Sequence, residues 1–163
     1  MTVTAVNKSI QTINDSIDAI VSSVEELPEK TIRWNPTEEE WSILQIVSHL
    51  NEAVPYWLGE VERVIAQPGS KWGRGLLDVD RLAAVASPDE LNVNEEITVL
   101  KGHKLQVANR LGTVSEAQLD EENPHRNFEK FGSKPVSFII DHFIAEHLEK
   151  HDGQIQRNLS KLN

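Results

Sequence analysis

The 163-residue sequence contains no cysteine. This absence excludes disulfide bonds, thiolate metal ligands and a cysteine nucleophile supplied by the chain. Long apolar runs are also absent, because no stretch approaches the roughly 18 residues that a membrane-spanning helix needs. Residues 1–15 lack the basic start and apolar core of a signal peptide. We therefore expect a cytoplasmic protein with no membrane-spanning segment.

Positive charge is scarce. The chain has 16 lysine and arginine residues against 26 aspartate and glutamate residues, which gives a net charge of -10. A protein of this charge is repelled by the phosphates of nucleic acids and by anionic lipid surfaces. We therefore expect neither a nucleic-acid partner nor a membrane partner.

Several catalytic motifs are missing. The sequence has no GxSxG nucleophile motif and no GxxxxGK[ST] phosphate loop. The glycine-rich stretch GSKWGRG is not followed by a helix at the spacing of a dinucleotide-binding motif. The run HLEKH at 147–151 differs from the zinc-protease motif HExxH, since Leu148 occupies the position of the glutamate. These differences disfavour the corresponding enzyme classes.

Four stretches have apolar residues at alternating steps of three and four, the pattern of an amphipathic helix. The predicted helices span about residues 4–27, 37–66, 88–111 and 135–162. No stretch shows the alternation of a β-strand, and no internal repeat is present. The sequence therefore predicts an all-α four-helix bundle, formed as a single domain by residues 1–163.

The ends and connections of these helices carry further signals. Two capping boxes compete for the start of the second helix, Thr37 with Glu40 and Ser42 with Gln45. The connector at 67–87 is too long for a tight turn, and antiparallel neighbours need only a short one. We therefore expect the second and third helices to run parallel, joined by a long crossover.

The last predicted helix carries two histidines within its apolar stripe. His147 and His151 are four residues apart, so their rings lie on one face of the helix, one turn above the other. Burying two imidazoles is costly unless their nitrogens find partners. A divalent metal ion is one such partner, and hydrogen bonds to neighbouring core residues are another. The spacing alone leaves both interpretations open.

A metal site needs at least one more ligand. His49, at the edge of the apolar stripe of the second helix, is the best candidate, and it faces either a pocket or partly solvent. His142 projects to the opposite, polar side of the last helix. No spacing argument involves His103 or His125, and we expect both to lie at the surface.

Two segments carry a resemblance to a known family. They are EEWSILQIVSHLNE at 39–52 and HFIAEHLEKHDGQI at 142–155. In both, the chain resembles the DinB-like (DinB/YfiT-type) family of four-helix-bundle metalloenzymes. The residues that match the family pattern are Trp41, Ser42, His49, Leu50, His147, His151, Gln154 and Ile155. Many members have a second histidine directly before the last ligand, where this chain has Lys150.

The resemblance implies an up-down-down-up bundle, a homodimer, and a divalent-metal site formed by His49, His147 and His151, with nickel or zinc as the ion. Some members resemble S-transferases in which the metal activates a low-molecular-weight thiol. Three protein ligands leave an open coordination position, where a thiol loses its proton or a water becomes a nucleophile. We expect Trp72 and the 67–87 connector to cover that position.

The expected function is therefore that of a divalent-metal-dependent enzyme with a small-molecule substrate, either a thiol S-transferase or a metal-assisted hydrolase. The sequence identifies no catalytic residue apart from the three histidines. Two alternatives stay open. One is a non-catalytic metal-binding or stress-related protein with the same histidines, and the other is a metal-free bundle that binds small molecules or proteins.

Overall fold

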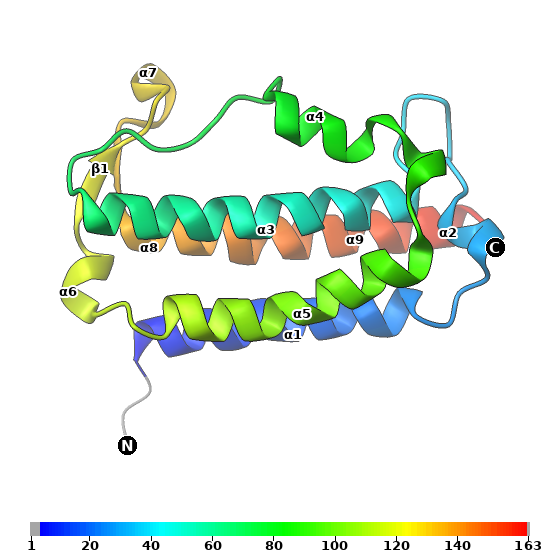
Figure 1. Ribbon diagram of the computed structural model, residues 1–163, viewed down its shortest axis with the longest axis horizontal. Helices are drawn as coiled ribbons and strands as arrows, with labels where there is room; N and C mark the ends of the chain where they lie inside the picture. Colours follow the sequence, from blue (N-terminus) through cyan, green and yellow to red (C-terminus); the bar gives the residue numbers. More distant parts are fainter. Residues whose placement is uncertain (1–3, 163) are drawn as a thin grey trace.

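Four long helical segments lie side by side in the structure, a computed structural model that describes residues 4–162 (Figure 1). The first three are α1 (Ala5–Val24), α3 (Ile43–Ala66) and α5 (Val93–Leu111). The fourth is a continuous run of α8 (Val136–Phe138), the π-helical segment η2 (Ile139–Ala145) and α9 (Glu146–Lys161). The predicted all-α four-helix bundle is confirmed.

The chain follows an up-down-down-up path. Figure 1 shows α1 and α9 running in one direction and α3 and α5 in the other. Both α1 and α3 pack against α5 on one side and against α9 on the other. The parallel arrangement of α3 and α5 agrees with the length of the crossover between them, which contains α4 (Val79–Ala86) and the short 3₁₀ helix η1 (Pro88–Glu90).

Side-chain capping decides where α3 begins. The Ser42 hydroxyl accepts a hydrogen bond from the backbone N–H of Gln45 at 3.1 Å, and the Gln45 side chain accepts one from the Ser42 N–H at 2.9 Å. This reciprocal pair satisfies two N–H groups that lack partners within the helix. The competing candidate, Thr37, instead closes a turn by accepting from the N–H groups of Glu39 and Glu40.

The start of α5 is set in the same way. The Asn92 side chain accepts a hydrogen bond from the backbone N–H of Glu95 at 3.0 Å. The sequence Ser-Pro-Asp-Glu at 87–90, which predicted the helix start near residue 88, forms only η1, and α5 begins three residues later at Val93.

Short elements fill the connections. They are α2 (Glu29–Ile32), α6 (Glu116–Leu119), β1 (Glu122–Pro124), α7 (Phe128–Phe131) and β2 (Ser133–Pro135). The two strands pair antiparallel, with Asn123 opposite Lys134. We expected no strand, and this prediction was wrong because three-residue strands are too short to show an alternating pattern.

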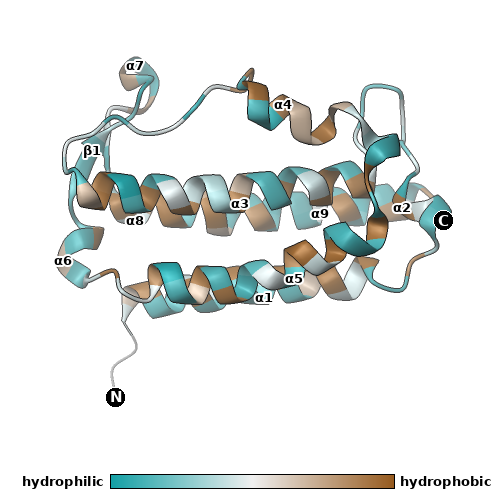
Figure 2. Cartoon of the chain, viewed as in Figure 1, coloured by the Kyte–Doolittle hydropathy of each residue, from teal (hydrophilic) through white to brown (hydrophobic). Residues whose placement is uncertain are grey.

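The core lies between the apolar faces of the four long segments. One fully buried residue from each shows this: Ile13, Leu50, Leu100 and Leu148. Figure 2 shows hydrophobic and hydrophilic residues mixed along every long helix, as expected for helices that bury one face. Within residues 4–162, no helix has the length and apolar character needed to cross a bilayer.

The last long segment departs from the uninterrupted α-helix that the sequence predicted. The backbone N–H of Glu146 donates to the carbonyl of Asp141, five residues earlier, which defines a π turn. Such turns are rare and occur frequently at functional sites. Here the wider turn lies directly before His147.

Candidate metal centre

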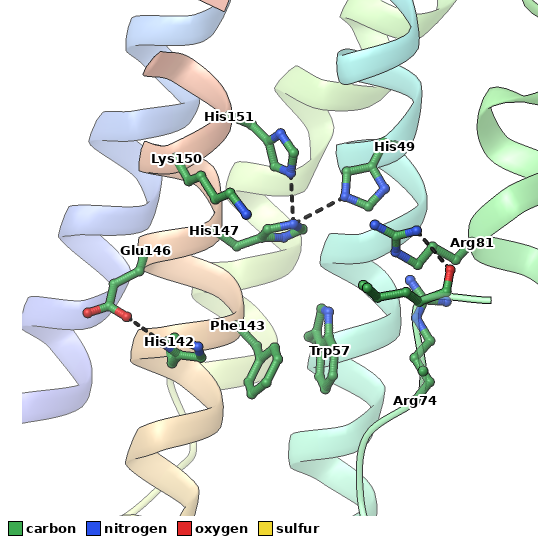
Figure 3. Close-up of a pocket in the computed structure, with 12 residues that line it drawn as sticks. His49, Trp57, Arg74, Arg81, His142, Phe143, Glu146, His147, Lys150 and His151 are labelled. Carbon is green, nitrogen blue, oxygen red and sulfur yellow. Dashed lines mark hydrogen bonds and ion pairs between the residues drawn. The ribbon is translucent and has the colours of Figure 1, made fainter. Parts of the chain in front are cut away.

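The structure brings together the three histidines that the sequence identified (Figure 3). His49 projects from α3, and His147 and His151 project from α9. The Nε2 atom of His147 lies 3.1 Å from Nε2 of His49 and 2.9 Å from Nε2 of His151. His49 is 1% exposed and His151 is 7% exposed, so the cluster lies largely inside the bundle.

These distances suit ligands of a shared metal ion. Two ring nitrogens, each about 2.0–2.1 Å from one ion, would be about 2.9 Å apart at right angles and about 3.3 Å apart at the tetrahedral angle. Among residues 4–162, no fourth histidine or carboxylate joins the group. The donor set is therefore three imidazoles, which suit divalent zinc and nickel.

Hydrogen bonds among the rings alone do not satisfy the cluster. Nδ1 of His151 lies 2.8 Å from Oε1 of Gln154, an oxygen that can only accept a hydrogen bond. Nδ1 therefore carries the proton of the neutral ring, and Nε2 carries a lone pair. Nε2 of His147 faces two other Nε2 atoms and can offer at most one N–H. Nδ1 of His49 is buried with no partner. A cation that accepts three lone pairs fits this arrangement.

Burial keeps the rings neutral. Desolvation is the main cause that lowers the pKa of His49 to about 2 and of His147 to about 3, and repulsion from the neighbouring rings is the next. Desolvation also lowers the pKa of His151. Imidazole binds metals in its neutral form, so all three rings are ready to act as ligands near pH 7.

Trp41 forms one wall of the cluster. Its ring centroid lies 5.1 Å from that of His49 and 6.2 Å from that of His151, on which it stacks. The Asn158 side chain donates to the Trp41 carbonyl at 2.9 Å and fixes the backbone there. Only the family resemblance points to Trp41 in the sequence, because its position just before α3 gives no sign of contact with α9.

A pocket of about 400 Å³ opens beside the histidines (Figure 3). Its wall combines aromatic, charged and small residues from α3, from the crossover with α4, and from the η2–α9 run. Apart from the three histidines, the lining residues are Trp57, Arg74, Gly75, Leu76, Arg81, His142, Phe143, Glu146 and Lys150. Sequence reasoning missed most of them because they come from the crossover and from positions around the π turn.

The crossover covers this pocket, but Trp72 does not. The residues that line the wall from this segment are Arg74, Gly75, Leu76 and Arg81. Trp72 is fully buried away from it, where its indole N–H donates to the Asn123 carbonyl at 2.8 Å and its ring packs on His125. The expectation for Trp72 was therefore wrong, and its role is to anchor the crossover.

His142 also differs from the expectation. It is exposed, as its polar side predicted, but it lines the pocket rather than the opposite surface. In a regular α-helix, residues five apart point about 140° away from each other. A π turn brings residues five apart almost into line, and so moves His142 toward the side of His147. Nδ1 of His142 lies 2.7 Å from Oε2 of Glu146.

Two further histidines are buried, where we expected surface positions. His103 is 6% exposed on α5, and His125 is 4% exposed. Nδ1 of His125 accepts a hydrogen bond from the Asn127 N–H at 2.8 Å, and its ring packs on Trp72. Neither joins the three-histidine cluster.

Comparisons with known proteins bear on the family. The sequence profile of the DinB superfamily matches residues 13–155. No curated protein matches the sequence. Among solved structures, the chain is similar to YfiT from Bacillus subtilis, which is described as a probable metal-dependent hydrolase with an unusual four-helix bundle topology. The two align with a TM-score of 0.75 at 12% sequence identity, over 98% of this chain and 91% of YfiT. The likeness to YfiT supports the fold, and the profile match over most of the chain shows that this protein belongs to the DinB superfamily.

Proposed function

We propose that this protein is a divalent-metal-dependent enzyme that acts on a small molecule, with His49, His147 and His151 as the metal ligands and nickel or zinc as the ion. One observation carries the proposal: three Nε2 atoms converge beside a pocket, and within residues 4–162 no fourth protein ligand closes the site. Catalytic metal sites differ from structural ones in keeping such an open position.

An ion bound here would supply Lewis-acid chemistry, by lowering the pKa of a water or a thiol in the open position. The chain contributes orientation and shielding. Gln154 holds the His151 ring with Nε2 toward the cluster, and Trp41 stacks on that ring. Both hydrolysis and thiol transfer require this same arrangement, and they differ only in the nucleophile.

The description of YfiT as a probable metal-dependent hydrolase supports water as the nucleophile. The family resemblance to thiol-dependent S-transferases supports a thiol. We therefore propose a metal-activated nucleophile as the shared chemistry, and the two reactions as its alternatives.

The open position can be tested with cobalt in place of the native ion. Cobalt-loaded protein is titrated with 2-mercaptoethanol while the visible and near-ultraviolet spectrum is recorded. We expect a saturable thiolate-to-cobalt charge-transfer band. A spectrum that does not respond to the thiol would show a closed coordination sphere, and the proposal would then fail.

The choice between the reactions is tested by turnover. Zinc- or nickel-loaded protein is assayed for hydrolysis of p-nitrophenyl acetate and for cysteine transfer to monochlorobimane. The activity that belongs to the site should disappear after chelation and in His147→Ala, and persist in Arg157→Gln, whose side chain is exposed on α9 away from the pocket. Activity that survives in His147→Ala would not come from this site.

A further inference from the structure

The pocket wall contains an arginine with no acidic partner. Arg81 lines the pocket next to His49 (Figure 3). Its Nη1 donates to the Leu76 carbonyl at 2.9 Å. No carboxylate of residues 4–162 forms an ion pair with its guanidinium. The remaining N–H groups therefore make no ion pair with a carboxylate of these residues, although Glu52 and Asp78 lie close enough to act on the charge.

Arg74, the other arginine of this wall, is used differently. Its guanidinium binds both oxygens of Glu52 at 2.5 and 2.7 Å and reaches Asp78 at 3.3 Å. It also lies 3.9 Å above the centre of the Tyr56 ring, and only 4% of its side chain is exposed. The acidic partners balance the charge of Arg74 within the protein. Because Glu52 and Tyr56 belong to α3, these contacts also fix the crossover to that helix.

Arg81 is held in position by its own helix. The Asp78 side chain caps α4 by accepting from the Arg81 backbone N–H at 3.1 Å. The helix is tied to α3 where Gln45 donates to the Val85 carbonyl at 2.9 Å and Ser48 donates to the Ala84 carbonyl at 2.6 Å. The guanidinium is therefore placed beside His49 before any ligand arrives, which reduces the entropic cost of binding.

An anion would relieve an unfavourable state of this side chain. Burial, followed by repulsion from Arg74, lowers the pKa of Arg81. Arginine nevertheless stays charged in proteins. A ligand carboxylate or phosphate can accept two parallel N–H bonds from a guanidinium, which is the strongest common arrangement for these groups.

The other charges of the pocket agree with an anionic ligand. Lys150 also lines it and has no ion pair among the described residues. The one acidic lining residue, Glu146, contacts His142 at 2.7 Å. In a chain of net charge -10, a hollow lined by free cations favours ligands of the opposite sign.

A second hollow continues from the first. It measures about 790 Å³ and shares residues 74–76 and Phe143 with the pocket. Arg126 and Lys130 add two more positive charges to its wall, and its one acidic lining residue, Asp78, pairs with Arg74. The charge that favours an anion therefore extends beyond the immediate surroundings of the histidines.

We propose that the pocket binds an anionic small molecule, with its carboxylate or phosphate group on Arg81 and its reacting group beside the three histidines. The second half of this statement rests on the proposed metal-dependent function. The first half depends only on Arg81 and the pocket.

The test is a calorimetric titration of metal-loaded and of chelator-treated protein with two probes, succinate and inorganic phosphate. Four forms are compared: wild type, Arg81→Gln, Arg81→Lys and Arg157→Gln. The last is a matched control, because it removes the same charge from an exposed arginine of α9 that lies outside the pocket. The tighter of the two probes identifies the anionic group.

We expect Arg81→Gln to weaken binding of the preferred probe by tenfold or more while keeping its metal content. Arg81→Lys should retain part of the affinity, and Arg157→Gln should stay within twofold of wild type. Equal affinity in Arg81→Gln and wild type would overturn the proposal. So would an equal loss in Arg157→Gln, or the absence of binding of both probes to wild type.

The chelator-treated arm separates this inference from the proposed function. Binding to metal-free protein that depends on Arg81 supports the anion site, even if the wild type proves unable to hold a metal. Binding that needs the metal and is unaffected by Arg81→Gln places the anion on the ion alone and contradicts the inference.

Discussion

At the scale of single residues, the neighbours of each histidine ring decide what its nitrogens can do. Gln154 accepts from Nδ1 of His151 at 2.8 Å and so leaves Nε2 of that ring free to bind an ion. His151 and Gln154 are three residues apart, one turn of α9, so the sequence placed the two side chains on one face. No such spacing relates Trp41 to the histidines, because Trp41 lies outside the helices.

We predict that Gln154→Ala lowers the affinity for zinc by about 10- to 100-fold, the usual effect of removing a residue that orients a ligand. The affinity is measured by competition with a chromophoric chelator. Gln156→Ala, which alters an exposed glutamine on the same helix, serves as the control and should bind zinc like wild type. An unchanged affinity in Gln154→Ala would mean that the ring is oriented by other contacts.

His103 leads to a prediction about pH. Burial lowers its pKa in the folded protein, while in the unfolded chain the pKa lies near 6.5. Below pH 6.5 the unfolded state therefore binds a proton that the folded state does not, and the free energy of unfolding falls as the pH falls. Nε2 of His103 is buried without a hydrogen-bond partner among the described residues, so a proton added there in the folded state would have no acceptor.

We predict that His103→Leu makes the free energy of unfolding less dependent on pH below about 6.5, by at most about 1.4 kcal/mol per pH unit. Urea denaturation at a series of pH values measures this slope. His142→Leu, at an exposed position, is the comparison. A slope in His103→Leu equal to that of wild type would show that His103 is protonated to the same extent in both states.

At the scale of elements, the crossover shows how a loop of irregular structure is fixed. Gly73 adopts φ +96°, and a Cβ atom there would lie 2.4 Å from Nε2 of the buried His125. Both the backbone conformation and the contact require glycine.

We predict that Gly73→Ala lowers the free energy of unfolding by about 1–3 kcal/mol. Gly75→Ala, in the same loop but with no atom within 4 Å of the added Cβ, should change it by less than about 0.5 kcal/mol. Chemical denaturation of both variants makes the comparison. Equal stability of the two would contradict the close packing described for Gly73 and His125.

The long helices could be predicted from the sequence, because each repeats its apolar residues over several turns, and α3 also carries its own cap, Ser42. The π turn could not. A helical wheel assumes a constant angle per residue. It therefore ignores the wider turn between Asp141 and Glu146 and predicts the wrong side for His142. The hairpin and α4 depend on contacts between distant residues, such as Gln45 with Val85.

At the scale of the whole molecule, the net charge does not describe the charge of the pocket. The net charge of -10 correctly describes an acidic protein, yet Arg81 and Lys150 in its pocket form no ion pair with any residue of 4–162. Composition therefore bears on macromolecular partners and says little about the charge of a small ligand. The homodimer that the family resemblance implies stays a prediction, which sedimentation equilibrium can check.

The bundle has a large apolar core between its four long segments. Each buried aliphatic side chain from the four segments contributes about 1.5–3 kcal/mol before chain entropy is subtracted. We therefore predict that chelator-treated protein keeps its helical circular dichroism and melts cooperatively, at a lower temperature than the metal-loaded form. Complete unfolding on chelation would show that the site is structural, as in a zinc finger.

The central claim is that His49, His147 and His151 hold one divalent ion, and metal analysis of protein purified without an affinity tag tests it most directly. After reconstitution with zinc or nickel and gel filtration, we predict about one ion per chain for wild type and for His142→Ala, and none for His147→Ala or His151→Ala. Full metal content in His147→Ala, or none in reconstituted wild type, would contradict the account.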